Sequence, residues 1–162
     1  MKKISKIILT LILVITLLQN CMNRDLQELN AKQDVIEKVN ELFIFTDNRD
    51  WEKVKSVFAD RVDFDMTSLA GGKPNLLANT EITSAWENGL KNLKAIHHQA
   101  GNYLVQINGD TADVFCYATA THYLPVKDGK NVKTFVGSYD IHLVKKEKWY
   151  IDRFKFNVKY VE

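Results

Sequence analysis

The sequence predicts an α+β domain in which N-terminal helices pack on one face of a curved, mainly antiparallel sheet. Three observations lead to this fold class. In the first half of the chain, apolar residues recur every three or four positions, which is the spacing of amphipathic helices. In the second half, apolar and polar residues alternate, as in half-buried strands. The dipeptides Asn108-Gly109 and Asp128-Gly129 then favour tight turns, so strands that follow one another pair as hairpins.

The first 20 residues have the pattern of an export signal. Lys2, Lys3 and Lys6 precede an apolar run from Ile7 to Leu18. At 12 residues this run is shorter than the ~20 that a membrane-spanning helix needs. The sequence LQNC that ends at Cys21 resembles the lipobox of bacterial lipoproteins, which implies removal of residues 1–20 and a lipid on Cys21 that anchors the chain to the membrane of the cell envelope. An ordinary signal peptide or an uncleaved anchor is the alternative.

The charge of the remaining chain argues against a nucleic-acid partner. Without the three lysines of the signal, the formal net charge changes from +2 to −1, and Lys and Arg are interspersed with acids. Cysteine usage indicates an exported chain without disulfides, because Cys21 is the expected lipidation site and Cys116 stands alone on a predicted strand. We expect Cys116 to be a small buried side chain and not a nucleophile.

Residues 21–26 are predicted as a tether and residues 27–162 as one domain that starts with helices. A long amphipathic helix is expected over residues 25–46. Asp50 is placed to cap a short helix over residues 51–58. Thr80 is placed to cap a third helix, whose buried stripe comprises Ile82, Trp86, Leu90 and Leu93.

Five strands are expected after the first two helices. The first spans residues 62–66 and is followed by a loop with Gly71, Gly72 and Pro74, whose composition suits a mobile segment at a pocket mouth. The central hairpin joins residues 96–107 to residues 111–126 through Asn108-Gly109, and strands over residues 132–144 and 149–161 follow.

The strand from residue 111 to residue 126 has two different faces. One face carries small apolar residues and ends in a histidine: Ala112, Val114, Cys116, Ala118, Ala120 and His122. Small side chains under a layer of helices leave room for a cavity, into which His122 would open. The other face carries Phe115, Tyr117 and Tyr123, which we expect to pack against a second subunit in a homodimer.

Four stretches resemble a known family. They are FTDNRDW over residues 45–51, IHHQAGN over residues 96–102, NGDTA over residues 108–112, and residues 137–149. On these stretches the chain, from about Gln27 to Tyr160, resembles SnoaL-like proteins of the nuclear-transport-factor-2-like superfamily. The resemblance implies a cone-shaped fold with a pocket, which in that superfamily serves dehydratases, isomerases, cyclases, hydrolases and binding proteins.

Among the enzymes of this superfamily, scytalone dehydratase has the pattern of catalytic and pocket residues that this chain resembles most. The resemblance implies that Asp47, His98 and His122 are catalytic and that Asp140 is a polar pocket residue. Thr46 stands where the dehydratase has a tyrosine, and the second tyrosine of that enzyme has no clear counterpart here.

An Asp and His pair can perform acid/base chemistry without a metal or another cofactor. A carboxylate that accepts a hydrogen bond from one imidazole nitrogen makes the other nitrogen a better base, which can take a proton from carbon next to a carbonyl. The expected substrate-binding residues are Asn102, Asp140 and Trp86. Asn102 is expected on the same strand face as His98. Zinc is an alternative, but the adjacent His97 and His98 point to opposite faces of a strand, so at most one could bind it.

Two functions follow from this interpretation. The first is an exported, cofactor-independent lyase, such as a dehydratase, or an isomerase that acts on a small apolar or aromatic hydroxy-carbonyl compound. The second is a lipoprotein module of the cell envelope that binds a ligand or a partner protein without catalysis. In that case Asp47 only ends its helix and His98 is a hydrogen-bonded core residue.

Overall fold

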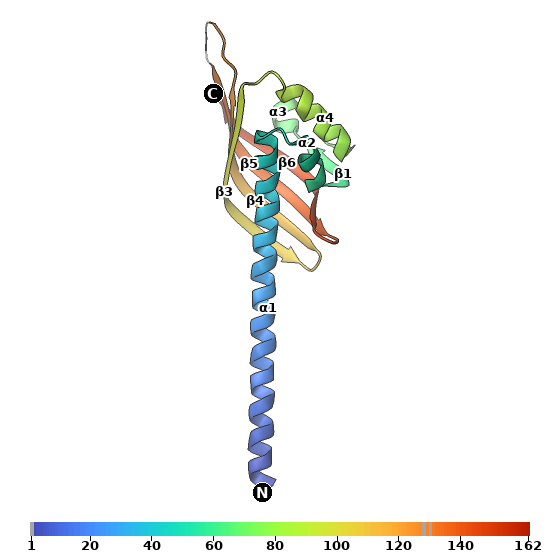
Figure 1. Cartoon of the computed structure of the whole chain (residues 1–162), viewed down its shortest axis with the longest axis vertical. Helices are drawn as coiled ribbons and strands as arrows, with labels where there is room; N and C mark the ends of the chain where they lie inside the picture. The colour runs from blue at the N-terminus through green and yellow to red at the C-terminus, as the bar shows by residue number, and fades with distance from the viewer. Residues whose placement is uncertain (1, 128, 130) are drawn as a thin grey trace.

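In a computed structural model, the chain is described over residues 2–127, 129 and 131–162, and for residues 2–14, 16, 17 and 21 only the backbone is described. This part of the chain forms four helices and six strands (Figure 1). The helices are α1 (Lys2–Asp47), α2 (Trp51–Val57), α3 (Thr67–Ala70) and α4 (Asn79–Leu90). The strands are β1 (Phe58–Asp65), β2 (Asn75–Ala78), β3 (Ala95–Asn108), β4 (Thr111–Tyr123), β5 (Val132–Lys145) and β6 (Trp149–Val161).

The six strands form a single curved sheet in the order β2-β1-β6-β5-β4-β3. All neighbouring pairs are antiparallel except β1 and β6, which are parallel. Figure 1 shows the C-terminal part of α1 crossing one face of the sheet, with α2, α3 and α4 gathered near one end of that face. The predicted α+β fold with a mainly antiparallel sheet is confirmed.

The hairpin of β3 and β4 forms as predicted, but its turn lies one residue later. Asn108 still pairs with Thr111, so the two turn residues are Gly109 and Asp110. Gly109 has φ +63, and glycine is the residue that tolerates a positive φ at the first position of a two-residue turn. Strand β4 ends at Tyr123, three residues before the predicted end. The predicted Asp128-Gly129 turn lies partly outside the described residues.

The segment between α2 and α4 contains more structure than the sequence predicted. Strand β1 already starts at Phe58, which was expected in the helix, and ends at Asp65. The expected loop is flanked by the short helix α3 and by β2, a four-residue edge strand that the sequence analysis missed. Because β2 has only four residues, its sequence NLLA is too short to show a clear period.

Two predicted helix caps differ from the structure. Helix α4 starts at Asn79, so Thr80 lies inside the first turn instead of capping it, while the Glu81 side chain accepts a hydrogen bond from the Ala78 backbone N–H at 2.6 Å. Asp50 holds the N-cap position of α2, but its side chain makes no cap hydrogen bond. It pairs with Lys53 at 2.6 Å instead.

Helix α1 is anchored to the sheet only by its C-terminal part. Val35, Val39 and Leu42 are fully buried, whereas the side chains of residues 22–30 are all exposed. The backbone of residues 21–26, the predicted tether, is helical, and the side chain of Cys21 lies outside the described residues. Within the described part of the chain, no helix is both long and apolar enough to cross a membrane.

The two faces of β4 differ as predicted. Its small residues are buried beneath the helices, and Cys116 is fully inaccessible. Phe115 and Tyr117 lie on the outer face, where Tyr117 is 41% exposed. The inner face of β4 therefore faces the helices, and it carries Ala120 and His122 towards them.

Candidate active site

Asp47 and His98 form a hydrogen-bonded pair between α1 and β3. Asp47 is the last residue of α1, and its Oδ1 lies 2.6 Å from Nδ1 of the His98 imidazole. Its second oxygen, Oδ2, accepts the backbone N–H of His98 at 2.8 Å. The two side chains are only 17% and 11% exposed. One carboxylate therefore fixes both the backbone and the ring of the same histidine.

This contact determines which imidazole nitrogen is free. A carboxylate accepts hydrogen bonds, so Nδ1 of His98 carries the proton and Nε2 is left with the lone pair. The ring also stacks on Phe43, with centroids 5.3 Å apart and planes at 20°. His98 is thus held in one orientation by a carboxylate on one side and an aromatic ring on the other.

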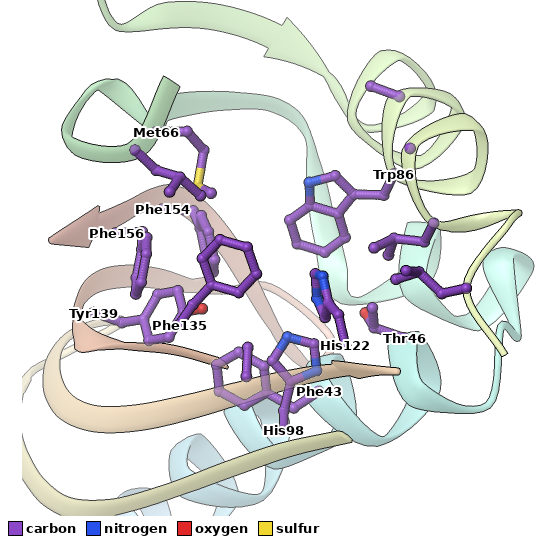
Figure 2. A pocket seen from close by; sticks show the side chains of 16 residues that line it. Phe43, Thr46, Met66, Trp86, His98, His122, Phe135, Tyr139, Phe154 and Phe156 are labelled. Atoms are coloured by element: carbon purple, nitrogen blue, oxygen red, sulfur yellow. The ribbon is translucent and has the colours of Figure 1, made fainter. Parts of the chain in front are cut away.

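The imidazole of His98 lies in the wall of a cavity of about 280 Å³ between the helices and the inner face of the sheet. Most lining residues are apolar, and many are aromatic (Figure 2). They are Phe43, Thr46, Met66, Leu69, Ala85, Trp86, Gly89, Leu90, Leu93, His98, Ala120, His122, Phe135, Tyr139, Phe154 and Phe156. The cavity has the size and lining of a site for a small apolar molecule.

His122 is the second histidine in the cavity wall. Its ring centroid lies 6.5 Å from that of His98 and 4.9 Å from that of Phe135. Burial, together with the smaller effects of the nearby His98 and Lys133, lowers the pKa of His122 from 6.5 to about 4, although the carboxylate of Asp47 acts in the opposite direction. His122 is therefore a neutral imidazole at neutral pH, which can donate one hydrogen bond and accept another.

Tyr139 is a polar residue of the cavity that the sequence analysis missed. It is 5% exposed, and burial raises the pKa of its phenol, which keeps the hydroxyl protonated and able to donate a hydrogen bond. The alternation along β5 could have identified it, because Tyr139 shares strand parity with the apolar residues Phe135, Ile141 and Leu143.

Asn102 and Asp140 do not lie in the cavity. In β3, an extra residue between Gly101 and Leu104 forms a bulge, where Asn102 has φ 56, and the residue points to solvent. The period-2 count from His98 fails at this bulge. Asp140 lies on the outer face of β5, because its neighbour Tyr139 points inward, and it accepts a hydrogen bond from Asn157 at 2.7 Å.

Trp86 and Thr46 do line the cavity. Trp86 comes from the buried stripe of α4 and contacts Phe58, Phe64 and Phe154 with its ring. The Thr46 hydroxyl donates to the Leu42 carbonyl at 2.7 Å within α1. Since a hydroxyl has one proton, this bond leaves Thr46 no donor for a ligand.

The other two histidines lie away from the cavity. His97 is 72% exposed, with its Nδ1 3.8 Å from Asp47 Oδ2. His142 pairs with Asp152 at 2.6 Å, and Arg153, in the same strand as Asp152, pairs with Asp113 at 2.9 Å. Among the side chains that the structure describes, no group of three or more His, Cys, Asp or Glu residues could hold a metal ion.

The helices that cover one face of a curved sheet and the cavity between the two layers define a protein with a nuclear-transport-factor-2-like fold. Within this class, the chain belongs to the SnoaL-like domain family, whose model matches residues 27–155.

Solved structures agree with this fold. A protein from Kribbella flavida is 23% identical, with a TM-score of 0.79, and the match covers 82% of this chain and 93% of that one. A candidate scytalone dehydratase from Novosphingobium aromaticivorans is 14% identical, with a TM-score of 0.71 and coverage of 85% and 88%. A hexachlorocyclohexane dehydrochlorinase from Novosphingobium barchaimii is 13% identical, with a TM-score of 0.70 and coverage of 85% and 92%. Among curated proteins, no sequence matches this chain.

Proposed function

We propose that this protein is a cofactor-independent lyase or isomerase that acts on a small apolar or aromatic hydroxy-carbonyl compound. The observation that carries the proposal is the pair of Asp47 and His98 in the wall of an apolar cavity, with Nδ1 of the imidazole 2.6 Å from the carboxylate. A buried histidine whose tautomer is fixed by a carboxylate is suited to act as a general base through its other ring nitrogen.

In the proposed dehydration, Nε2 of His98 removes the proton from the carbon next to the substrate carbonyl. The electron pair of the broken C–H bond forms the new C=C bond, and the C–O bond to the β-hydroxyl breaks. The imidazolium then returns its proton to the departing hydroxide, so that water leaves and the histidine is neutral again. Asp47 stabilises the positive charge that His98 carries between these two transfers.

Tyr139 and His122 are the residues proposed to polarise the carbonyl. Both lie in the cavity wall, and both are neutral hydrogen-bond donors at neutral pH for the reasons given above. A donor directed at the carbonyl oxygen stabilises the negative charge that develops when the proton is removed. Tyr139 therefore supplies a hydroxyl of the kind that Thr46 cannot offer.

The names of two relatives support elimination chemistry. A dehydratase expels water and a dehydrochlorinase expels hydrogen chloride, and both reactions remove a proton from carbon and a leaving group from its neighbour. The alternative, a binding protein without catalysis, is favoured by the intrahelical bond of Thr46, which leaves the cavity with few polar groups.

The test is a panel of small apolar β-hydroxy carbonyl compounds, with the absorbance of the conjugated product as the readout. We expect His98→Gln and Asp47→Asn to lower the rate of dehydration by about 10²-fold to 10⁴-fold, the range of general acid/base catalysis. His97→Gln is the matched control, because this neighbouring histidine is exposed, and it should keep the wild-type rate. If compounds bind but none is turned over, the binding alternative replaces the enzyme.

The cell-envelope location is part of the proposal. It is supported by the positive start, the 12-residue apolar run and the lipobox-like sequence before Cys21. We expect labelled fatty acid to be incorporated into the wild type in a bacterial host, and Cys21→Ala to remove the label. Labelling of the Cys21→Ala variant would contradict lipidation at this residue.

A homodimer through the outer sheet face is also proposed. Leu104, Tyr117 and Tyr160, which lie on the outer face of the sheet, are 69%, 41% and 54% exposed, and large apolar or aromatic side chains exposed on one sheet face favour a protein interface. Sedimentation velocity should give a dimer for the wild type and a monomer for Leu104→Lys. A wild-type monomer at micromolar concentration would contradict this part of the proposal.

A further inference from the structure

The turn that follows α1 has an unusual residue at its left-handed position. The Arg49 N–H donates to the Thr46 carbonyl at 3.0 Å, and the Asp50 N–H donates to the Phe45 carbonyl at 2.9 Å. This pair of bonds is the Schellman motif, which ends a helix with one residue at positive φ. That residue is Arg49, with φ 56, at a position where glycine is the usual choice because it lacks a Cβ.

The side chain of Arg49 makes a contact that glycine could not make. Its Nη2 donates to the backbone carbonyl of Leu93 at 2.6 Å, across 44 residues of sequence. Leu93 lies in the link between α4 and β3 and lines the cavity. The next residue, Lys94, donates its N–H to the Tyr123 carbonyl at 2.7 Å, so the link is also fixed to the end of β4.

This contact lies beside the pair of Asp47 and His98. Arg49 follows Asp47 by two residues, and Leu93 precedes His98 by five. Three hydrogen bonds therefore join the same two segments: one from the Arg49 guanidinium and two to the Asp47 carboxylate. All three bonds require the same spacing between the two segments, so loss of the Arg49 contact would act on the other two.

We propose that Arg49 is a positioning residue, which holds the end of α1 against the start of β3 so that Asp47 stays bonded to His98. An effect of Arg49 on catalysis rests on the proposed function. Its effect on the contact between Asp47 and His98 does not, because that contact can be measured without a substrate. A turn that served only to end the helix would be better made with glycine, since Arg must adopt a left-handed conformation here.

The experiment compares three variants of the full chain by NMR of histidine side chains. Arg49→Gly and Arg49→Asn remove the guanidinium with residues that tolerate positive φ, while Arg49→Lys keeps a cationic donor and the backbone strain. The readout is the rate at which the Nδ1 proton of His98 exchanges with water, because a proton bonded to Asp47 is protected until that bond opens. Melting temperature is measured alongside it.

We expect faster exchange in the Gly and Asn variants, by about tenfold for the loss of one hydrogen bond, and at least partial restoration in the Lys variant. The melting temperature of the Gly variant should stay near that of the wild type, since relief of backbone strain offsets the lost contact. Unchanged exchange in the Gly and Asn variants would overturn the proposal. So would exchange that rises in all three variants in step with a fall in melting temperature.

The same variants separate this proposal from the proposed function. If exchange responds as expected and the wild type turns over no compound of the panel, the enzyme proposal fails while the role of Arg49 in the geometry stands. If the wild type is active and exchange does not respond, only the role of Arg49 is rejected.

Discussion

The two carboxylate oxygens of Asp47 bind two different groups of His98: Oδ1 contacts the imidazole Nδ1 at 2.6 Å, and Oδ2 accepts the backbone N–H at 2.8 Å. The second bond is the less obvious one. It holds the strand backbone, and not only the ring, at a fixed position relative to the end of α1. Asp47 is therefore a structural residue and a candidate catalytic residue at once.

Replacement of Asp47 should lower stability as well as any activity. Asp47→Ala leaves the His98 N–H and Nδ1–H without their acceptor in a site that is mostly closed to water, which we expect to cost about 2 kcal/mol of unfolding free energy. Urea denaturation measures this loss. Asp63→Ala, at an exposed aspartate of β1, should change stability by no more than about 0.5 kcal/mol. An equal loss in both variants would contradict the structural role of Asp47.

Protonation of His122 should destabilise the fold at acidic pH. The pKa of His122 is 6.5 when unfolded and about 4 in the fold, so the unfolded chain binds more protons between these values. Stability is therefore unaffected by His122 above pH 6.5 and falls as the pH decreases from 6.5 to about 4. We expect the melting temperature of His122→Phe to depend less on pH in this window than that of the wild type, and parallel curves would contradict the lowered pKa.

Gly137 should not tolerate a side chain. A Cβ at this position of β5 would lie 2.4 Å from the Asn157 carbonyl oxygen and 2.5 Å from the Phe156 ring. Gly137→Ala must displace β6 or push Phe156 into the cavity, at an expected cost of about 1 to 3 kcal/mol. Gly101→Ala is the matched control in β3, because nothing lies within 4 Å of its Cβ. Thermal unfolding of both variants tests the difference.

Ser68 should hold α3 against β6. Its hydroxyl donates to the Phe156 carbonyl at 2.5 Å and accepts the Val158 N–H at 3.0 Å. Both residues lie beyond Lys155, the last residue of β6 that pairs with β1. We expect Ser68→Ala to speed hydrogen exchange of the Val158 amide by about fivefold to tenfold, because one hydrogen bond of this kind is worth about 1 kcal/mol. Ser56→Ala, which changes an exposed serine of α2, should leave that amide unaffected.

Much of the fold could be predicted from the sequence because its long strands alternate and its turns contain glycine. The alternation of β4 correctly gave the inner and outer faces, and the bounds of β6 agree with the prediction. Sequence patterns failed where the structure departs from regular spacing. The bulge at Asn102 reverses the alternation of β3, and the short edge strand β2 has no measurable period.

The site was less predictable than the fold. Asp47 and His98 are 51 residues apart, and no spacing rule brings together a helix end and a strand at such a distance. Their pairing was expected only from the resemblance to a known family. The same resemblance placed Asp140 in the pocket, one residue away from Tyr139, which the structure puts there. On a strand, one residue is the difference between the two faces of the sheet.

The position of β6 has a consequence for how the chain folds. The last strand lies between β5 and β1, so the first strand to be synthesised pairs in parallel with the last. Hairpins from β3 to β5 join close neighbours and can form early, but β1 and β2 have no sheet to join until residue 149 and those after it are available. Phe154 and Phe156 also line the cavity. A chain that stops before Trp149 would contain Asp47 and both cavity histidines, but it would lack the strand that joins β1 to β5 and two aromatic residues of the cavity wall. Completion of the cavity therefore waits for the last strand.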